Sequence, residues 1–232
     1  MGAADMKLHD LGISRRYGVH VPRRVAKSPA LVVAIHGGGL GSPEQHARMT
    51  GWSALADRER SFVVVYPEGL KATWNAGNGA LGYAGRSGVD DVGYLSSMLL
   101  DVARRYAIND RRVYLSGFSN GSMMAHRYAA EDPGLVAAIA GVAGGFSAIP
   151  NLQIIGPPAV RIVHGFNDTH VPFSGGVGPD ALDPYEHLPI QQTESWWRAQ
   201  GAHVETLYGK WGHVWPDGET ARQWAWFKGV RL

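Results

Sequence analysis

The chain has 232 residues, a formal net charge of +2 and 45% hydrophobic residues, which are values typical of one globular domain. We therefore expect a single domain over residues 1–232. Its 22 basic residues are scattered or in isolated pairs, so the sequence does not predict nucleic-acid binding, and the absence of cysteine excludes disulfides and thiolate catalysis.

Short apolar runs alternate with helical segments along the chain. Unbroken apolar runs rich in β-branched residues are typical of strands buried on both faces of a parallel sheet. They predict strands at residues 17–21, 31–35, 62–66, 113–115, 136–142, 160–163 and 204–208. Helical patterns predict helices at residues 92–106, 120–130, 190–200 and 219–227. This alternation predicts an α/β fold, a three-layer α/β/α sandwich around a mostly parallel central sheet.

Two glycine-rich segments, residues 71–88 and 174–188, show no periodicity and predict long irregular loops. Loops of this length in a compact domain are usually functional. No apolar run reaches the length of a transmembrane helix, so no membrane partner is expected. Residues 1–10 lack the basic and apolar regions of a signal peptide, which predicts a cytoplasmic protein, or a secreted one whose leader was removed.

Ser119 is a candidate nucleophile. It lies in the pentapeptide Gly117-Phe118-Ser119-Asn120-Gly121, a G-x-S-x-G pattern between a predicted strand and a predicted helix. A sharp turn at this point lifts the serine hydroxyl out of the backbone and presents it to a base. Small residues at both ends allow the strand and the helix to approach closely.

Asp168 and His213 are the candidate acid and base. Asp168 follows the predicted strand at residues 160–163, where ligand sites of open α/β sheets gather. His213 follows the last predicted strand and precedes the last helix. The order Ser119, Asp168, His213 is that of a catalytic triad in an α/β-hydrolase. A turn aspartate without catalytic function is the alternative for Asp168.

The remaining candidates surround this triad. The backbone amides of Gly38, in a run of three glycines, and of Asn120, at a helix start, predict an oxyanion hole. Trp74 and Trp215 are candidate walls of a substrate pocket, and a core position is the equal alternative for Trp74. No His, Asp or Glu cluster has metal-ligand spacing, so neither a metal nor a cofactor is expected.

Taken together, the motifs resemble those of the polyhydroxybutyrate depolymerase-like and feruloyl esterase-like α/β-hydrolases. The resemblance covers about residues 17–216 and is carried by residues 16–22, 36–39, 66–69, 73–77, 88–93, 117–121, 164–168 and 212–216. It implies an α/β-hydrolase fold with a minimal lid, and it places the family's catalytic serine, aspartate and histidine on Ser119, Asp168 and His213. Many relatives carry cysteines after the Trp-Asn-Ala-Gly segment, which this chain lacks.

These observations predict a serine esterase that acts through an acyl-enzyme on a small-molecule or oligomeric ester. Feruloyl or other aryl esters, acetyl-xylan and short hydroxyalkanoate esters are the expected substrate classes. Two alternatives stay open: a serine peptidase with the same triad, and a non-catalytic binding protein on a hydrolase scaffold. The sequence does not indicate an oligomeric state.

Overall fold

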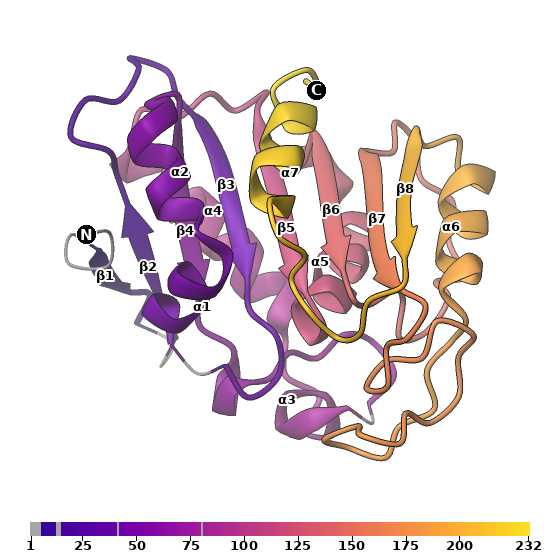
Figure 1. The fold of residues 1–232 in the computed structure, drawn as a ribbon. Coiled ribbons are helices and arrows are strands. Elements are labelled where there is room, and N and C mark those ends of the chain that lie inside the picture. Colours follow the sequence, from indigo (N-terminus) through magenta and orange to yellow (C-terminus); the bar gives the residue numbers. More distant parts are fainter. Residues whose placement is uncertain (1–5, 13–14, 41, 80) are drawn as a thin grey trace.

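The computed structural model describes residues 6–12, 15–40, 42–79 and 81–232. Within this part of the chain, one sheet contains eight strands: β1 (Lys7–Asp10), β2 (Arg16–His20), β3 (Ala30–Ile35), β4 (Phe62–Pro67), β5 (Val113–Phe118), β6 (Ala138–Val142), β7 (Ala159–Gly165) and β8 (Val204–Gly209). Their order is β1-β2-β4-β3-β5-β6-β7-β8 (Figure 1). β2 pairs antiparallel with β1 and β4, and the other neighbours are parallel, which confirms the predicted mostly parallel sheet.

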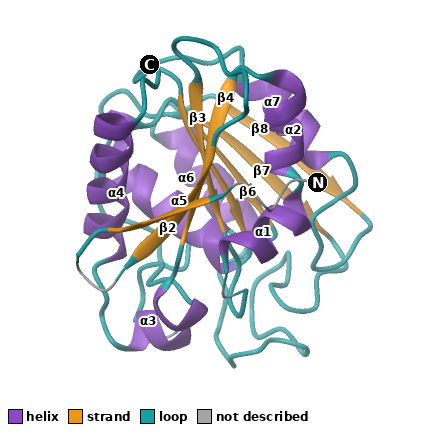
Figure 2. Cartoon of the chain, turned by 90° about the vertical axis from the view of Figure 1, so that its left-hand side faces the viewer, coloured by secondary structure: helices purple, strands orange, loops and turns teal. Residues whose placement is uncertain are grey.

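Helices cover both faces of this sheet. They are α1 (Pro43–Thr50), α2 (Trp52–Glu59), α3 (Gly82–Arg86), α4 (Asp91–Arg105), α5 (Asn120–Glu131), α6 (Ile190–Ala199) and α7 (Glu219–Phe227), with 3-10 turns at Leu70–Ala72 and Pro133–Leu135. Figure 2 shows α1, α2 and α7 on one side of the sheet and α4 and α5 on the other. None of the helices in the described part of the chain is both long and apolar enough to cross a membrane.

Each face of the sheet has its own apolar core, which explains the unbroken apolar runs. On the side of α1, α2 and α7, the core contains Trp52, Trp224 and Phe227. On the side of α4, α5 and α6, it contains Tyr94 and Trp197. Because β3 and β4 lie between these two cores, every residue of both strands is buried. The three-layer α/β/α prediction is confirmed.

The sequence patterns miss four elements. β1 contains one apolar residue and is mostly exposed, so it has no strand signature. α1 and α2 are short and are separated by Gly51, whose φ of 71° ends one helix and starts the next. The side chain of Ser42 accepts a hydrogen bond from the backbone N–H of Gln45, a capping signal that indicates α1 independently of periodicity. α3 lies inside the segment predicted as an irregular loop.

The parallel strands bring several loops to one edge of the sheet. Ile35, the last residue of β3, pairs with Gly117 in β5, and Phe118 at the end of β5 pairs with Val142 in β6. Gly165 and Gly209, the last residues of β7 and β8, pair with each other. The segments that follow these strands therefore leave the same edge, which is where ligand sites form in open α/β sheets.

Candidate active site

Ser119 occupies a strained turn between β5 and α5. Its φ of 54° and ψ of −122° place a non-glycine residue in the left-handed half of the Ramachandran plot. Its backbone N–H donates to the carbonyl of Val142 at 2.8 Å, which ties the turn to β6. The turn therefore holds the Ser119 side chain beyond the end of the sheet.

The two glycines of the pentapeptide are required by close backbone approach. A Cβ on Gly117 would lie 2.3 Å from the carbonyl oxygen of Gly121. A Cβ on Gly121 would lie 2.3 Å from the carbonyl oxygens of Ile35 and His36. Both distances are far below van der Waals contact, so glycine at these positions lets α5 start directly against β3 and β5.

His213 joins Ser119 and Asp168 through its two ring nitrogens. Its Nε2 lies 2.9 Å from Ser119 Oγ, and its Nδ1 lies 2.8 Å from Asp168 Oδ2. The carboxylate of Asp168 is fully buried, whereas the imidazole remains 13% exposed. With an ionised Asp168, Nδ1 carries the proton and Nε2 is free to accept the proton of the serine hydroxyl.

Asp168 is held as a carboxylate by several groups. Its second oxygen, Oδ1, accepts the backbone N–H groups of His170 at 2.9 Å and Val171 at 2.8 Å. Burial raises the pKa of Asp168, but the hydrogen bond and charge of His213, the Val171 amide and the charge of His164 together bring the pKa below its ordinary value. The carboxyl group therefore stays ionised at neutral pH.

The loops that carry Asp168 and His213 are bonded to each other. The Phe166 N–H donates to the carbonyl of Gly209 at 2.7 Å, and the Asn167 N–H donates to that of Trp211 at 3.1 Å. These bonds continue the β7–β8 pairing beyond the sheet. They fix the separation of Asp168 and His213 from outside the triad.

Gly38 and Asn120 line the same cleft as Ser119 and lie next to each other. A Cβ on Gly38 would lie 3.8 Å from the Asn120 Cβ, so the two backbones are adjacent. Among the described residues, neither peptide N–H has a hydrogen-bond acceptor. His36 fixes the glycine run, because its Nδ1–H donates to the Gly37 carbonyl at 2.7 Å while its Nε2 accepts the Gly69 N–H at 2.9 Å.

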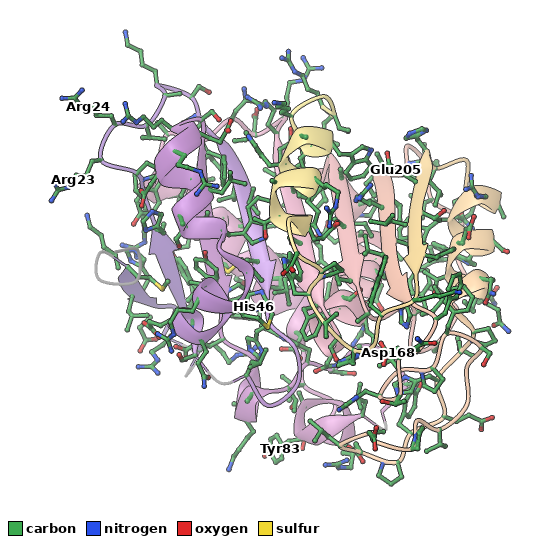
Figure 3. The ribbon with its side chains drawn as sticks, viewed as in Figure 1. Arg23, Arg24, His46, Tyr83, Asp168 and Glu205 are labelled. Atoms are coloured by element: carbon green, nitrogen blue, oxygen red, sulfur yellow. The ribbon has the colours of Figure 1, made fainter. Side chains whose placement is uncertain are left out.

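A cleft of about 660 Å³ opens in front of Ser119. Its walls come from the segments after β3, β5 and β8, from α3, and from the loop at residues 181–183. Figure 3 shows Asp168 just beyond the strand ends and Tyr83, a lining residue, at the outer edge of the molecule. Asp183 joins two of these walls by accepting the Gly82 N–H at 2.8 Å and pairing with Arg86.

The two predicted tryptophan walls have different positions. Trp215 lines the cleft, and its Nε1–H donates to Thr220 Oγ1 at 3.0 Å. The prediction for Trp74 as a pocket wall is wrong, because its side chain is fully buried in the core beside Tyr94. The Trp74 indole donates to the His36 carbonyl at 2.9 Å. The Asn120 side chain accepts the backbone N–H of Trp74 through Oδ1 and donates to the backbone carbonyl of Trp74 through Nδ2. Trp74 thus supports the backbone around the two free amides.

His170 is a cleft residue that the sequence does not single out. Its ring stacks on that of His213, with centroids 4.7 Å apart and planes 17° apart. Asp168, His170 and His213 have potential ligand atoms within 4.8 Å of one another, a grouping that could hold a metal ion. Asp168 and His213 are, however, already bonded to each other. Only the fold brings His170 against His213, so no local motif marks it.

Comparison with known proteins identifies relatives among esterases. The family model described as Esterase PHB depolymerase matches residues 16–165. A bifunctional acetylxylan esterase/xylanase of Neocallimastix patriciarum is 31% identical over 163 residues, covering 68% of this chain and 22% of that protein. Feruloyl esterase B of Neurospora crassa is 32% identical over 131 residues, covering 56% of this chain and 44% of that protein.

The matched segments make up less than half of each of these two relatives. A crystal structure of a thermostable esterase matches this fold with a TM-score of 0.73 at 17% sequence identity, covering 98% of this chain and 64% of that chain. The predicted α/β-hydrolase fold is therefore confirmed. Since the family model spans more than half of the sequence, the chain belongs to the Esterase PHB depolymerase family.

Proposed function

We propose that this protein is a serine esterase in which Ser119 is the nucleophile, His213 the general base and Asp168 the residue that orients His213. The observation that carries the proposal is the position of His213. One imidazole lies 2.9 Å from the Ser119 hydroxyl and 2.8 Å from the Asp168 carboxylate. These distances are within the range over which a base takes a proton from a nucleophile.

The first half of the reaction forms an acyl-enzyme. The Ser119 hydroxyl gives its proton to His213 Nε2 while Oγ bonds to the ester carbonyl carbon, and the carbonyl oxygen becomes an oxyanion. The tetrahedral intermediate then breaks its bond to the alcohol oxygen, which takes the proton from His213. Asp168 keeps the imidazole in the required tautomer and stabilises the imidazolium.

The second half releases the acid. Water gives a proton to His213 Nε2 as its oxygen bonds to the acyl carbon, and collapse of the second intermediate returns the proton to Ser119. The N–H groups of Gly38 and Asn120 donate to the oxyanion in both halves. One such donor is worth about 2.7–4 kcal/mol in the transition state.

The lining of the cleft favours esters with a compact apolar or aryl acyl group. Phe118 and Trp215 meet edge to face at 6.3 Å beside the triad, and Met49 and Leu182 also line the cleft. The relatives named as acetylxylan and feruloyl esterases suggest the same range, acetyl esters of xylan and feruloyl esters. We propose these two ester classes as substrates, with short hydroxyalkanoate esters as a third.

The test compares the protein with its Ser119→Ala variant. The unmodified chain should hydrolyse p-nitrophenyl acetate and react at Ser119 with a fluorophosphonate probe, and the variant should do neither while its circular dichroism spectrum is unchanged. Parallel assays on aminoacyl anilides distinguish an esterase from a peptidase. Undiminished turnover by the variant, or faster cleavage of anilides than of esters, would overturn the proposal.

A further inference from the structure

A side cavity of about 260 Å³ adjoins the catalytic cleft. It is bordered by the junction of α1 and α2 and by residues of the segment 215–221, which leads into α7. Figure 1 shows this segment, drawn in yellow, running from the end of β8 back to α7. Met49 and Trp215 line both the cleft and the side cavity, so these two side chains form the partition between them.

Trp215 is the larger side chain of this partition. On the cleft side its ring meets that of Phe118 edge to face at 6.3 Å, and the Phe118 ring lies 5.1 Å from the ring of His213. Trp215 is only partly buried, so packing does not enclose the indole on every side. Its position therefore depends on the partner of its N–H group.

That partner is the hydroxyl of Thr220. The Trp215 Nε1–H donates to Thr220 Oγ1 at 3.0 Å, and the same hydroxyl donates its own proton to the backbone carbonyl of Thr50, the last residue of α1. Among the described residues, the indole N–H has no other acceptor. One buried hydroxyl thus joins α1, α7 and the wall of the cleft.

Thr220 is itself firmly placed in the fold. It follows Glu219, a fully buried residue whose carboxylate pairs with Arg161 of β7 at 3.2 Å and whose N–H donates to the Pro216 carbonyl at 3.0 Å. Loss of the Thr220 hydroxyl would therefore move the indole rather than α7. An N–H group without an acceptor in an apolar wall is unfavourable, whereas an indole that rotates toward solvent bonds to water.

A displaced indole would make the cleft and the side cavity continuous. Met49 and the buried Leu55 give the side cavity apolar surface, and the exposed residues Arg58 and Asp217 also line it. A flexible alkyl chain suits such an extension, because it bends to follow the apolar surface. Each methylene group that is removed from water contributes about a fourfold gain in affinity.

We propose that Thr220 is a positioning residue that holds Trp215 in the partition and thereby limits the acyl group to a length that fits the cleft alone. This inference rests on the proposed esterase function and adds a residue that determines which acyl groups are accepted. The side cavity is the space into which a longer straight-chain acyl group extends when the partition is open.

A kinetic experiment measures the ratio of kcat/KM for p-nitrophenyl octanoate to that for p-nitrophenyl acetate. Thr220→Val keeps the shape of the side chain but removes the hydroxyl. It should raise the ratio at least about tenfold through a lower KM for the octanoate, because burial of two further methylene groups is sufficient for this change. Trp215→Ala removes the partition directly and should also raise the ratio.

Two control variants separate this role from a general loss of structure. Thr220→Ser keeps the hydroxyl and should keep the ratio of the unmodified chain. Thr193→Val is the matched control, because the Thr193 hydroxyl is also buried and accepts the Phe146 N–H at 2.8 Å, but the residue lines neither the cleft nor the side cavity. An unchanged ratio in Thr220→Val, or an equal rise in Thr193→Val, would overturn the proposal.

A binding experiment tests the same role without turnover. Octanamide, an uncharged compound with the same acyl chain, is titrated calorimetrically into the Ser119→Ala variant and into the double variant Ser119→Ala, Thr220→Val. The double variant should bind it at least about tenfold more tightly. Equal affinities would overturn the role of Thr220. Because no ester is cleaved, this result is independent of whether the proposed esterase activity is found.

Discussion

Lowering the pH should destabilise the folded chain through histidines that are buried in the uncharged form, among them His36, His46 and His126. Burial lowers the pKa of His36 to about 4 and the pKa values of His46 and His126 to about 3. His46 is the extreme case, because neither ring nitrogen has a hydrogen-bond partner among the described residues. His46, labelled in Figure 3, is a buried residue of α1, and its ring packs edge to face on those of Tyr66 and His36.

The size of the effect follows from the difference between the folded and unfolded pKa values. An unfolded histidine has a pKa of about 6.5, so between pH 6.5 and 4 the unfolded chain binds protons that the folded chain does not. Stability therefore falls as the pH falls through this window. From pH 8.0 to 5.5, each such histidine lowers the free energy of unfolding by about 1.4 kcal/mol, and three lower it by about 4 kcal/mol. The free energy of unfolding of a whole domain is typically about 5–15 kcal/mol.

Urea unfolding at pH 8.0 and 5.5 measures this loss, with His46→Phe as the diagnostic variant. Phenylalanine keeps an aromatic ring at the site but cannot titrate. Between pH 8.0 and 5.5, the unfolding free energy of the variant should therefore fall by about 1.4 kcal/mol less than that of the unmodified chain. His203→Gln, at an exposed position, is the control and should follow the unmodified chain. Equal pH dependence of His46→Phe and the unmodified chain would refute the reasoning.

Three further predictions concern the site. Asp168→Asn should lower kcat for p-nitrophenyl acetate by roughly 10⁴, because an amide stabilises the wrong tautomer of His213, and a loss under tenfold would contradict its role. Gly121→Ala should lower the unfolding free energy by about 3 kcal/mol, because its Cβ would meet backbone at 2.3 Å. Gly134→Ala, with nothing within 4 Å, should change it little in the same denaturation assay, and similar losses in both would contradict the steric argument. Methyl ferulate should be hydrolysed faster than a long-chain acyl ester, and Trp215→Ala should reduce this preference in paired kinetics; the reverse preference would exclude an aromatic pocket.

Local patterns in the sequence were sufficient to predict most of the sheet and the longer helices. The strands β3 and β4 are covered on both faces, so their apolar runs are continuous and easily recognised. α4 has both an apolar face and the Asp90 cap, whose side chain accepts the Gly93 N–H at 2.8 Å. By contrast, the buried face of α1 includes the polar residues His46 and Thr50, so its sequence lacks the regular spacing of apolar residues that indicates a helix. Its stability comes from packing on β3 and β4 rather than from its own composition.

The sequence by itself determined the order and spacing of Ser119, Asp168 and His213, because each follows a strand whose signature is local. Parallel strands then place their carboxyl ends at one edge, so chain order alone predicts that the three residues meet. The crowding at Gly117 comes from the local turn, because its nearest atoms belong to Gly121 and Ser122, whereas Gly121 is crowded by the distant carbonyls of Ile35 and His36.

Only the tertiary structure decided which side chains face the substrate. Trp74 and Trp215 are alike in the sequence, yet one is buried in the core and the other lines the cleft, because burial depends on residues far away in the chain. The stacking of His170 on His213 arises in the same way, from loops that meet after folding. Local patterns specify strands and turns, whereas contacts between distant loops specify the surfaces that select a ligand.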